Sequence, residues 1–166
     1  MFGKLVPKST ADSIHDIDLE NLRNHGITGI ITDLDNTLVG SRIAYATPEV
    51  EHWLELAKQA GFKVVIVSNN HKSRVSKFAE PLRIPFIYSA GKPTLSSFRK
   101  AMRTMGTSPS QTAMIGDQLF TDVFGGNRLG LFTILVNPVS RSEEALPTRI
   151  NRIFEKWIKR VMKFET

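Results

Sequence analysis

The stretch from Ile27 to Val39 constrains the fold more than any other part of the chain. It is an apolar, β-branched run that ends in two aspartates, Asp33 and Asp35, one residue apart. Because β-branched side chains suit a strand covered on both faces, the run predicts a central strand of a parallel sheet. Charges cannot stay unpaired in such an interior, so both aspartates are expected where the strand ends. Open parallel sheets bind ligands at this end of their strands.

The rest of the chain alternates between strand and helix patterns. Apolar runs predict five strands, at residues 27–34, 62–68, 85–89, 112–116 and 131–136. Helical spacing between them predicts helices over residues 47–61, 69–80, 93–106 and 119–128. This alternation is typical of a doubly wound α/β fold with right-handed crossovers and helices on both faces. Residues 9–26 contain scattered apolar residues and end at a glycine, which predicts a short helical lead-in packed on the sheet.

Several residues mark the expected helix starts. Thr47 and Pro48 are typical of an N-cap followed by a proline at the first helical position. Asn69 and Asn70 are candidate caps of the helix after the second strand, and Pro93 is expected to open the helix after the third. A helix N-terminus aimed at the site would present free N–H groups to a phosphate.

Three further motifs stand at the ends of predicted strands. Ser68 ends an apolar run, Lys92 lies within Gly-Lys-Pro just before a helix, and Gly116-Asp117 leads to Thr121-Asp122. With Asp33 and Asp35, these motifs resemble in type and order those of the haloacid dehalogenase (HAD) superfamily of phosphohydrolases. Shorter matches are similar to the YqeG-type branch of HAD subfamily IIIA; they are Ser68-Asn-Asn70, Glu80-Pro-Leu82, Ile84–Tyr88 and Gly125–Arg128.

The resemblance carries expectations about fold and activity. It implies a HAD-like (Rossmannoid) sheet of strand order 3-2-1-4-5, in which the first and fourth strands are neighbours and bring Asp33, Asp35 and Asp117 together. Related members of the branch act as phosphatidylglycerophosphate phosphatases, so the resemblance implies that activity here. The intervals from Asp33 to Ser68 and from Ser68 to Lys92 are filled by predicted loop, helix and strand, which leaves no room for a cap domain.

The resemblance to the HAD superfamily gives each candidate residue an expected role. Asp33 is the expected nucleophile, which would form an aspartyl-phosphate, and Asp35 the expected general acid and base. Mg²⁺ would be held by Asp33, the backbone carbonyl of Asp35 and Asp117, because Mg²⁺ prefers hard oxygen ligands.

The remaining candidates would support that chemistry. Ser68 would hydrogen-bond a phosphoryl oxygen, and Lys92 would neutralise charge spread over Asp33 and the phosphoryl group. Asp122 would act from the second shell, by holding a metal-bound water or by orienting Lys92. Asn69, Asn70 and Arg128 are further candidates for substrate binding, although Arg128 also suits an ordinary surface position.

Composition narrows the functional classes. The chain of 166 residues suits one domain, and the absence of cysteine excludes disulfides and thiolate zinc sites. The histidines lie at no ligand-like spacing, and no apolar run approaches the length of a membrane span. Without a signal-peptide pattern at the N-terminus, a cytoplasmic location is expected. A net charge of +6 favours polyanionic partners in general, with no strong signal for nucleic acid.

The C-terminal part is expected to differ from the rest. We assign residues 1–140 to the capless phosphatase domain with its lead-in, and residues 141–166 to a linker and a basic amphipathic helix. Residues 149–163 combine an apolar stripe with a net charge of +5. That helix would either pack on the domain or make a peripheral contact with the inner face of a membrane.

Three functions therefore remain open. The leading one is a Mg²⁺-dependent phosphatase of a phospholipid headgroup, namely phosphatidylglycerophosphate. The second is a phosphatase of a nucleic-acid end or of a small phosphorylated metabolite. The third is a non-catalytic HAD binding module, which the complete motif set disfavours because a scaffold has no physical need for all of it.

Overall fold

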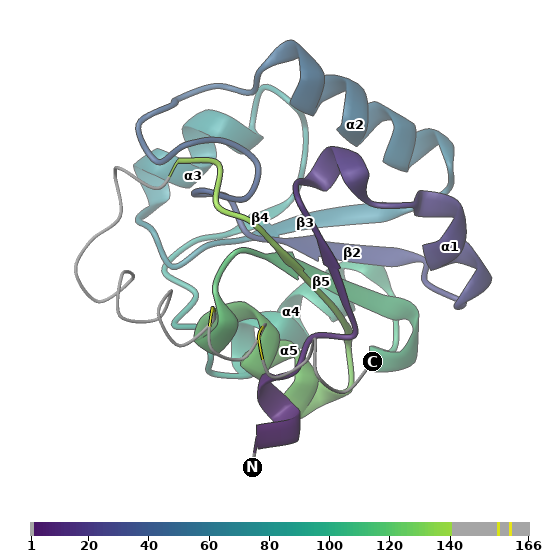
Figure 1. The fold of residues 1–166 in the computed structure, drawn as a ribbon. Coiled ribbons are helices and arrows are strands. Elements are labelled where there is room, and N and C mark those ends of the chain that lie inside the picture. The colour runs from purple at the N-terminus through teal and green to yellow at the C-terminus, as the bar shows by residue number, and fades with distance from the viewer. Residues whose placement is uncertain (1, 141–155, 157–159, 161–166) are drawn as a thin grey trace.

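The computed structural model describes residues 2–140, 156 and 160. Six parallel strands form one sheet in the order β1-β6-β5-β2-β3-β4 (Figure 1). The strands are β1 (Ser9–Ala11), β2 (Gly29–Thr32), β3 (Lys63–Val67), β4 (Phe86–Ile87), β5 (Thr112–Gly116) and β6 (Phe132–Val136). The helices are α1 (Leu19–Asn24), α2 (Pro48–Gln59), α3 (Lys72–Ala79), α4 (Ser96–Met105) and α5 (Phe124–Leu129). Short helical turns are η1 (Phe2–Leu5), η2 (Ile14–Asp16), η3 (Pro109–Gln111) and η4 (Leu119–Val123).

The predicted strand order is confirmed, because strands 3-2-1-4-5 of the sequence correspond to β4-β3-β2-β5-β6. The lead-in is only partly helical, as η2 and α1, and the prediction was wrong for residues 9–11. These residues form β1, which pairs in parallel with β6. The physical reason is the edge of β6, whose main-chain groups need partners. Three residues are too few for a hydrophobic period to be seen in the sequence.

Alternate residues of the central strands face two separate cores. Ile30, Val64 and Ile66 pack in the core that includes Trp53 and Leu54 of α2. Their strand neighbours, such as Ile31 and Val65, pack with α4 side chains in the second core. Figure 1 shows α1, α2 and α3 on one side of the sheet and α4 and α5 on the other. Burial of both faces explains the nearly continuous apolar runs of the strands.

The predicted helix start is confirmed for α2 and was wrong for α3 and α4. Thr47 caps α2, its side chain accepting from the Val50 N–H, and Pro48 follows at the first helical position. His71 caps α3 in place of Asn69 or Asn70, because its ring nitrogen accepts from the Arg74 N–H and both asparagine side chains have other partners. Pro93 does not open α4, which begins at Ser96 after a turn.

The intervals where HAD enzymes can carry a cap contain only the predicted elements. Between β2 and β3 lie the 36–46 loop and α2, and between β3 and Lys92 lie α3 and β4. The carboxyl edge of the central strands is therefore uncapped by any inserted domain at these two points.

The predicted linker and C-terminal helix lie outside the described residues, apart from two positions. Lys156 and Arg160 are helical and exposed. The boundary at residue 140 and the role of residues 149–163 stay predictions. Within the described part of the chain, no helix is both long and apolar enough to cross a membrane.

Candidate active site

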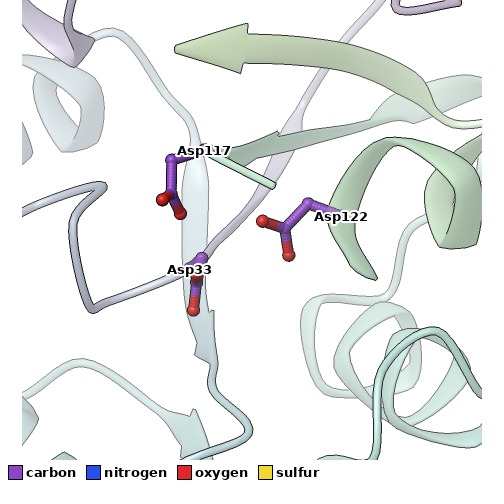
Figure 2. A group of neighbouring side chains, drawn as sticks. All are labelled: Asp33, Asp117 and Asp122. Atoms are coloured by element: carbon purple, nitrogen blue, oxygen red, sulfur yellow. The ribbon is translucent and has the colours of Figure 1, made fainter. Parts of the chain in front are cut away.

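Three buried carboxylates converge where β2 and β5 end. Asp33 follows β2 directly, and its N–H donates to the carbonyl of Ile115 on β5 at 3.0 Å. Asp117 follows β5, and Asp122 comes from the η4 turn beyond it. One oxygen of each carboxylate lies within 4.8 Å of the others, and Figure 2 shows Asp117 above Asp33, with Asp122 reaching toward them from the side. The register of the parallel pair β2–β5 thus brings together residues far apart in sequence.

Lys92 bridges two of these carboxylates. Its Nζ lies 3.1 Å from Asp33 Oδ1 and 2.8 Å from Asp122 Oδ1, and its side chain is almost fully buried. Asp33 Oδ1 also accepts from the Leu34 N–H at 2.8 Å. Asp33 Oδ2 has no hydrogen-bond partner among the described residues. One oxygen of Asp33 is therefore held in place, and the other is available for reaction.

Burial and charge determine the protonation of this pair. Burial raises the pKa of Asp33 to about 6, with Asp122 adding to the rise and Lys92 opposing it. Burial alone would lower the pKa of Lys92, but the carboxylates of Asp122 and Asp33 outweigh it and hold that pKa above its ordinary value. Lys92 is thus a permanent cation beside the expected nucleophile.

Asp122 orients the ammonium group of Lys92. Its Oδ1 accepts from Lys92 Nζ, and its Oδ2 accepts from the Gln118 N–H at 3.1 Å. A Cβ at position 116 would collide with the Asp122 side chain, so Gly116 is the residue that permits this approach. Of the two roles considered for Asp122, the contacts favour the orientation of Lys92.

Asp35 lies apart from the carboxylate cluster and has its own partners. Arg74 donates from Nε and Nη2 to Asp35 Oδ1, at 3.1 and 3.0 Å. Asn70 Nδ2 donates to Asp35 Oδ2 at 3.0 Å. Arg74 is a residue of the site that was not predicted from the sequence. Its position in the first turn of the helix after Ser68 could have identified it, because that turn faces the carboxyl edge of the sheet.

The two candidate asparagines both hold other site residues. Asn69 Oδ1 accepts from the Lys92 N–H at 2.8 Å, and Asn69 Nδ2 donates to the Lys92 carbonyl at 3.2 Å. Asn69 therefore fixes the backbone of Lys92, as Asn70 fixes the carboxyl group of Asp35. Ser68 is buried at the end of β3, where its Oγ accepts from the Asn70 N–H at 3.1 Å.

Two other residues complete the surroundings. Thr37, also missed from the sequence, donates from its hydroxyl to Asp117 Oδ1 at 3.0 Å and orients that carboxylate. Arg128 is not brought to the cluster. Its guanidinium lies over the Phe124 ring and donates to the carbonyl of Pro93 at 3.3 Å. A substrate role for Arg128 stays a prediction.

The cluster suits a divalent cation. It combines three buried carboxylates with one ammonium group, which leaves an excess of negative charge when the carboxylates are ionised. The ligand atoms are all hard oxygens, the donor set that Mg²⁺ prefers. Asp33 and Asp117 would hold the ion, while both oxygens of Asp122 are occupied. The carboxylate of Asp35 takes no part in the cluster, and its backbone carbonyl stays the predicted third ligand.

A family model for haloacid dehalogenase-like hydrolases matches residues 14–130, which include every residue of the site described above. The chain belongs to the haloacid dehalogenase-like hydrolase family. The predicted family membership is thereby confirmed. Since related phosphatases match along nearly the whole chain, the HAD protein described here is a phosphomonoester hydrolase.

Relatives of the HAD protein include several proteins named as phosphatases or probable phosphatases. It is 48% identical to the "Probable phosphatase YqeG" of Bacillus subtilis (strain 168), over 95% of this chain and 91% of that one. It is 27% identical to "Phosphatidylglycerophosphate phosphatase 1, chloroplastic/mitochondrial" of Arabidopsis thaliana, over 96% of this chain. The match spans 50% of the length of the Arabidopsis protein.

Solved structures support the same fold. The cobalt-bound deoxy-D-mannose-octulosonate 8-phosphate phosphatase of Haemophilus influenzae aligns with a TM-score of 0.56 at 20% identity. That alignment covers 68% of this chain and 69% of the other. At this level of identity the likeness establishes the fold alone.

Proposed function

We propose that this HAD phosphatase is a Mg²⁺-dependent phosphatase of phosphatidylglycerophosphate that acts through an aspartyl-phosphate on Asp33. The observation that carries the chemistry is the buried Lys92, bridging Asp33 and Asp122 at an uncapped sheet edge. The substrate is supported by similarity to named phosphatidylglycerophosphate phosphatases over nearly the whole of this chain, and by the open site, which could admit a lipid headgroup.

In the first step, the free Oδ2 of Asp33 attacks the phosphorus atom. The bond between phosphorus and the leaving oxygen breaks, and the carboxylic acid of Asp35 gives that oxygen its proton. Lys92 stabilises the charge that spreads over Asp33 Oδ1 and the phosphoryl oxygens. The Ser68 hydroxyl donates a hydrogen bond to one of those oxygens.

In the second step, the carboxylate of Asp35 takes a proton from a water molecule. The water oxygen attacks phosphorus, the bond to Asp33 breaks, and inorganic phosphate leaves while the Asp33 carboxylate is restored. Arg74 and Asn70 position Asp35 for both proton transfers. Mg²⁺ bound at Asp33 and Asp117 would supply charge neutralisation between the anionic nucleophile and the anionic substrate.

Removal of the metal should abolish turnover. A chelator should reduce hydrolysis of p-nitrophenyl phosphate to background, and Mg²⁺ should restore it. Ca²⁺ should not, because it takes more ligands at longer distances and loosens the in-line geometry. Mg²⁺ should also raise the melting temperature, and this rise should be smaller in Asp117→Asn. Equal rates with Mg²⁺ and Ca²⁺ would contradict the assignment.

Arg74→Met should affect poor leaving groups more than good ones, because a loosened Asp35 protonates the leaving oxygen less effectively. We expect kcat for an alkyl phosphate to fall about tenfold or more, which is part of the roughly 10²- to 10⁴-fold that a positioned proton donor contributes, because Asp35 itself is kept. The fall for p-nitrophenyl phosphate, whose leaving group needs little protonation, should be much smaller. Arg103→Met, on the exposed face of α4, is the matched control. Equal losses with both substrates would reject a role for Arg74 in proton transfer.

A substrate panel tests the proposed specificity. Phosphatidylglycerophosphate in mixed micelles, a 3′-phosphorylated oligonucleotide and small sugar phosphates should be compared by kcat/KM. We expect kcat/KM for the lipid to exceed that for every other substrate by about a hundredfold or more, a gap of roughly 3 kcal/mol in transition-state binding. A higher kcat/KM for the oligonucleotide or a sugar phosphate would favour the second candidate function instead.

A further inference from the structure

Exposed hydrophobic side chains gather at the edge of the sheet that carries the site. Among the described residues six large hydrophobic side chains are exposed, and four of them lie in segments that follow strands at the carboxyl edge. Tyr88 follows β4, Val139 follows β6, and Ile43 and Tyr45 lie in the 36–46 loop after β2. Such gathering marks an interaction surface more than scattered exposure does.

The two tyrosines are each paired with a lysine of α3. Lys77 Nζ lies 5.5 Å from the centre of the Tyr45 ring, and Lys72 Nζ lies 5.8 Å from that of Tyr88. Between these lysines, Arg74 of the same helix binds Asp35. Helix α3 thus joins two exposed aromatic–cation pairs to the group that we assign to proton transfer.

Main-chain hydrogen bonds tie the segment after β6 to the 36–46 loop, and the segment after β4 to the residues just before α3. The Val139 N–H donates to the Asn36 carbonyl at 2.9 Å, and the Ser89 N–H donates to the Asn70 carbonyl at 2.8 Å. Figure 1 shows the 36–46 loop, α3 and the segment after β6 at one edge of the molecule. We define the rim as six exposed residues of this edge: Arg42, Ile43, Tyr45, Lys72, Lys77 and Tyr88.

The chemistry of the rim points to an anionic lipid surface. Its charged residues, Arg42, Lys72 and Lys77, are all basic. Tyrosines beside lysines suit a membrane interface, where the ring sits at headgroup level and the ammonium group remains among anionic headgroups. A single-stranded nucleic acid would instead stack its bases on the tyrosine rings. The lysines already lie over those rings, and Ile43 has no aromatic ring on which a base could stack.

We infer that the rim docks the HAD phosphatase on an anionic bilayer, so that a phosphorylated headgroup reaches Asp33 while its lipid stays in the membrane. This inference rests on the proposed lipid substrate and adds the surface that presents it. It assigns membrane contact to residues 42–45, α3 and Tyr88, separately from any contribution of residues 149–163.

Co-sedimentation of the full chain with vesicles tests the inference without hydrolysis. Vesicles of phosphatidylcholine mixed with phosphatidylglycerol are compared with vesicles of phosphatidylcholine alone, in the presence of chelator. The full chain should bind the anionic vesicles, and more weakly at high salt. Lys72→Gln/Lys77→Gln and Ile43→Ser/Tyr45→Ser should each weaken this binding about tenfold or more.

Matched controls lie on other faces of the protein. Arg99→Gln/Lys100→Gln removes two exposed charges from α4, and Leu56→Ser removes an exposed hydrophobic side chain from α2. These variants should bind within about twofold of the natural chain, as expected for surface substitutions outside the contact. Thermal unfolding of every variant checks that its fold is kept.

Three outcomes would overturn the inference. The natural chain could fail to bind anionic vesicles, or the rim variants could bind as well as the controls, or the rim could prove to join two copies in solution. Analytical ultracentrifugation detects the last case as a dimer that Tyr45→Ser dissociates. The proposed function fails differently, through absent hydrolysis of phosphatidylglycerophosphate in detergent micelles, where vesicle docking is not required.

Discussion

Asp33→Asn should reduce phosphatase activity by at least about a thousandfold, because it removes the nucleophile while preserving the shape of the side chain. The measurement is kcat with p-nitrophenyl phosphate in the presence of Mg²⁺. Asp18→Asn, an exposed aspartate at the start of α1, serves as the control and should leave kcat nearly unchanged. Turnover of Asp33→Asn close to that of the natural chain would remove Asp33 from the nucleophile's role.

The same substitution should stabilise the metal-free protein at neutral pH. The pKa of Asp33 is raised from 3.8 to about 6. Between these two pH values, the folded state therefore holds a proton that the unfolded chain has already lost. Stability of the natural chain therefore falls as pH rises from about 4 to 6, and the cost is complete above pH 6. Removing this ionisation should add about 2 to 3 kcal/mol at pH 7.5.

Denaturant unfolding in chelator at several pH values measures this effect. The advantage of Asp33→Asn over the natural chain should shrink as pH falls toward 4 and vanish below it, where both the folded and unfolded natural chains carry the proton. An advantage that does not change with pH would mean that the titration of Asp33 is not its source.

Lys92→Met should damage both activity and stability. Loss of the cation that neutralises Asp33 and the phosphoryl group should lower kcat by at least about a hundredfold, in the range seen when one preorganised stabilising group is removed. Folding should suffer as well, because Asp33 and Asp122 would remain buried without their shared partner. Breaking a buried ion pair from one side costs about 3 to 5 kcal/mol.

A double variant separates these two effects. Lys92→Met/Asp122→Asn removes one of the unpaired charges and should recover part of the lost unfolding free energy, while kcat stays low. Lys100→Met, an exposed lysine of α4, controls for the loss of a lysine. If Asp122→Asn leaves the stability of Lys92→Met unchanged, the 2.8 Å contact between Lys92 and Asp122 does not account for the destabilisation.

The sequence predicted the fold best where a run of residues suits only one kind of element. The β-branched run before Asp33 and the apolar runs ending at Ser68 and Gly116 predict buried parallel strands, and all three are found. Strand β1 was missed because a three-residue edge strand leaves no period. Its position depends on the exposed edge of β6, a feature of the folded sheet and not of the local sequence.

The supporting residues of the site were harder to predict for a similar reason. Asn69 and Asn70 could be placed near the site from their position after Ser68, but their partners, Lys92 and Asp35, are set by the crossing of three segments. Arg74 and Thr37 carry no motif of their own, and their roles depend on side-chain directions that spacing alone does not give. The carboxylates and Lys92 could be predicted together because each stands at a strand end or before a helix.

The most direct test of the account follows the phosphoryl group itself. Phosphatidylglycerophosphate labelled in its terminal phosphate is mixed with the protein and Mg²⁺, quenched in acid after milliseconds to seconds, and analysed for label on the protein. We expect a transient label on the peptide that contains Asp33. The label should be sensitive to hydroxylamine, as an acyl phosphate is, and absent from Asp33→Asn. Release of labelled inorganic phosphate at the full rate by Asp33→Asn, or a label on another residue, would contradict it.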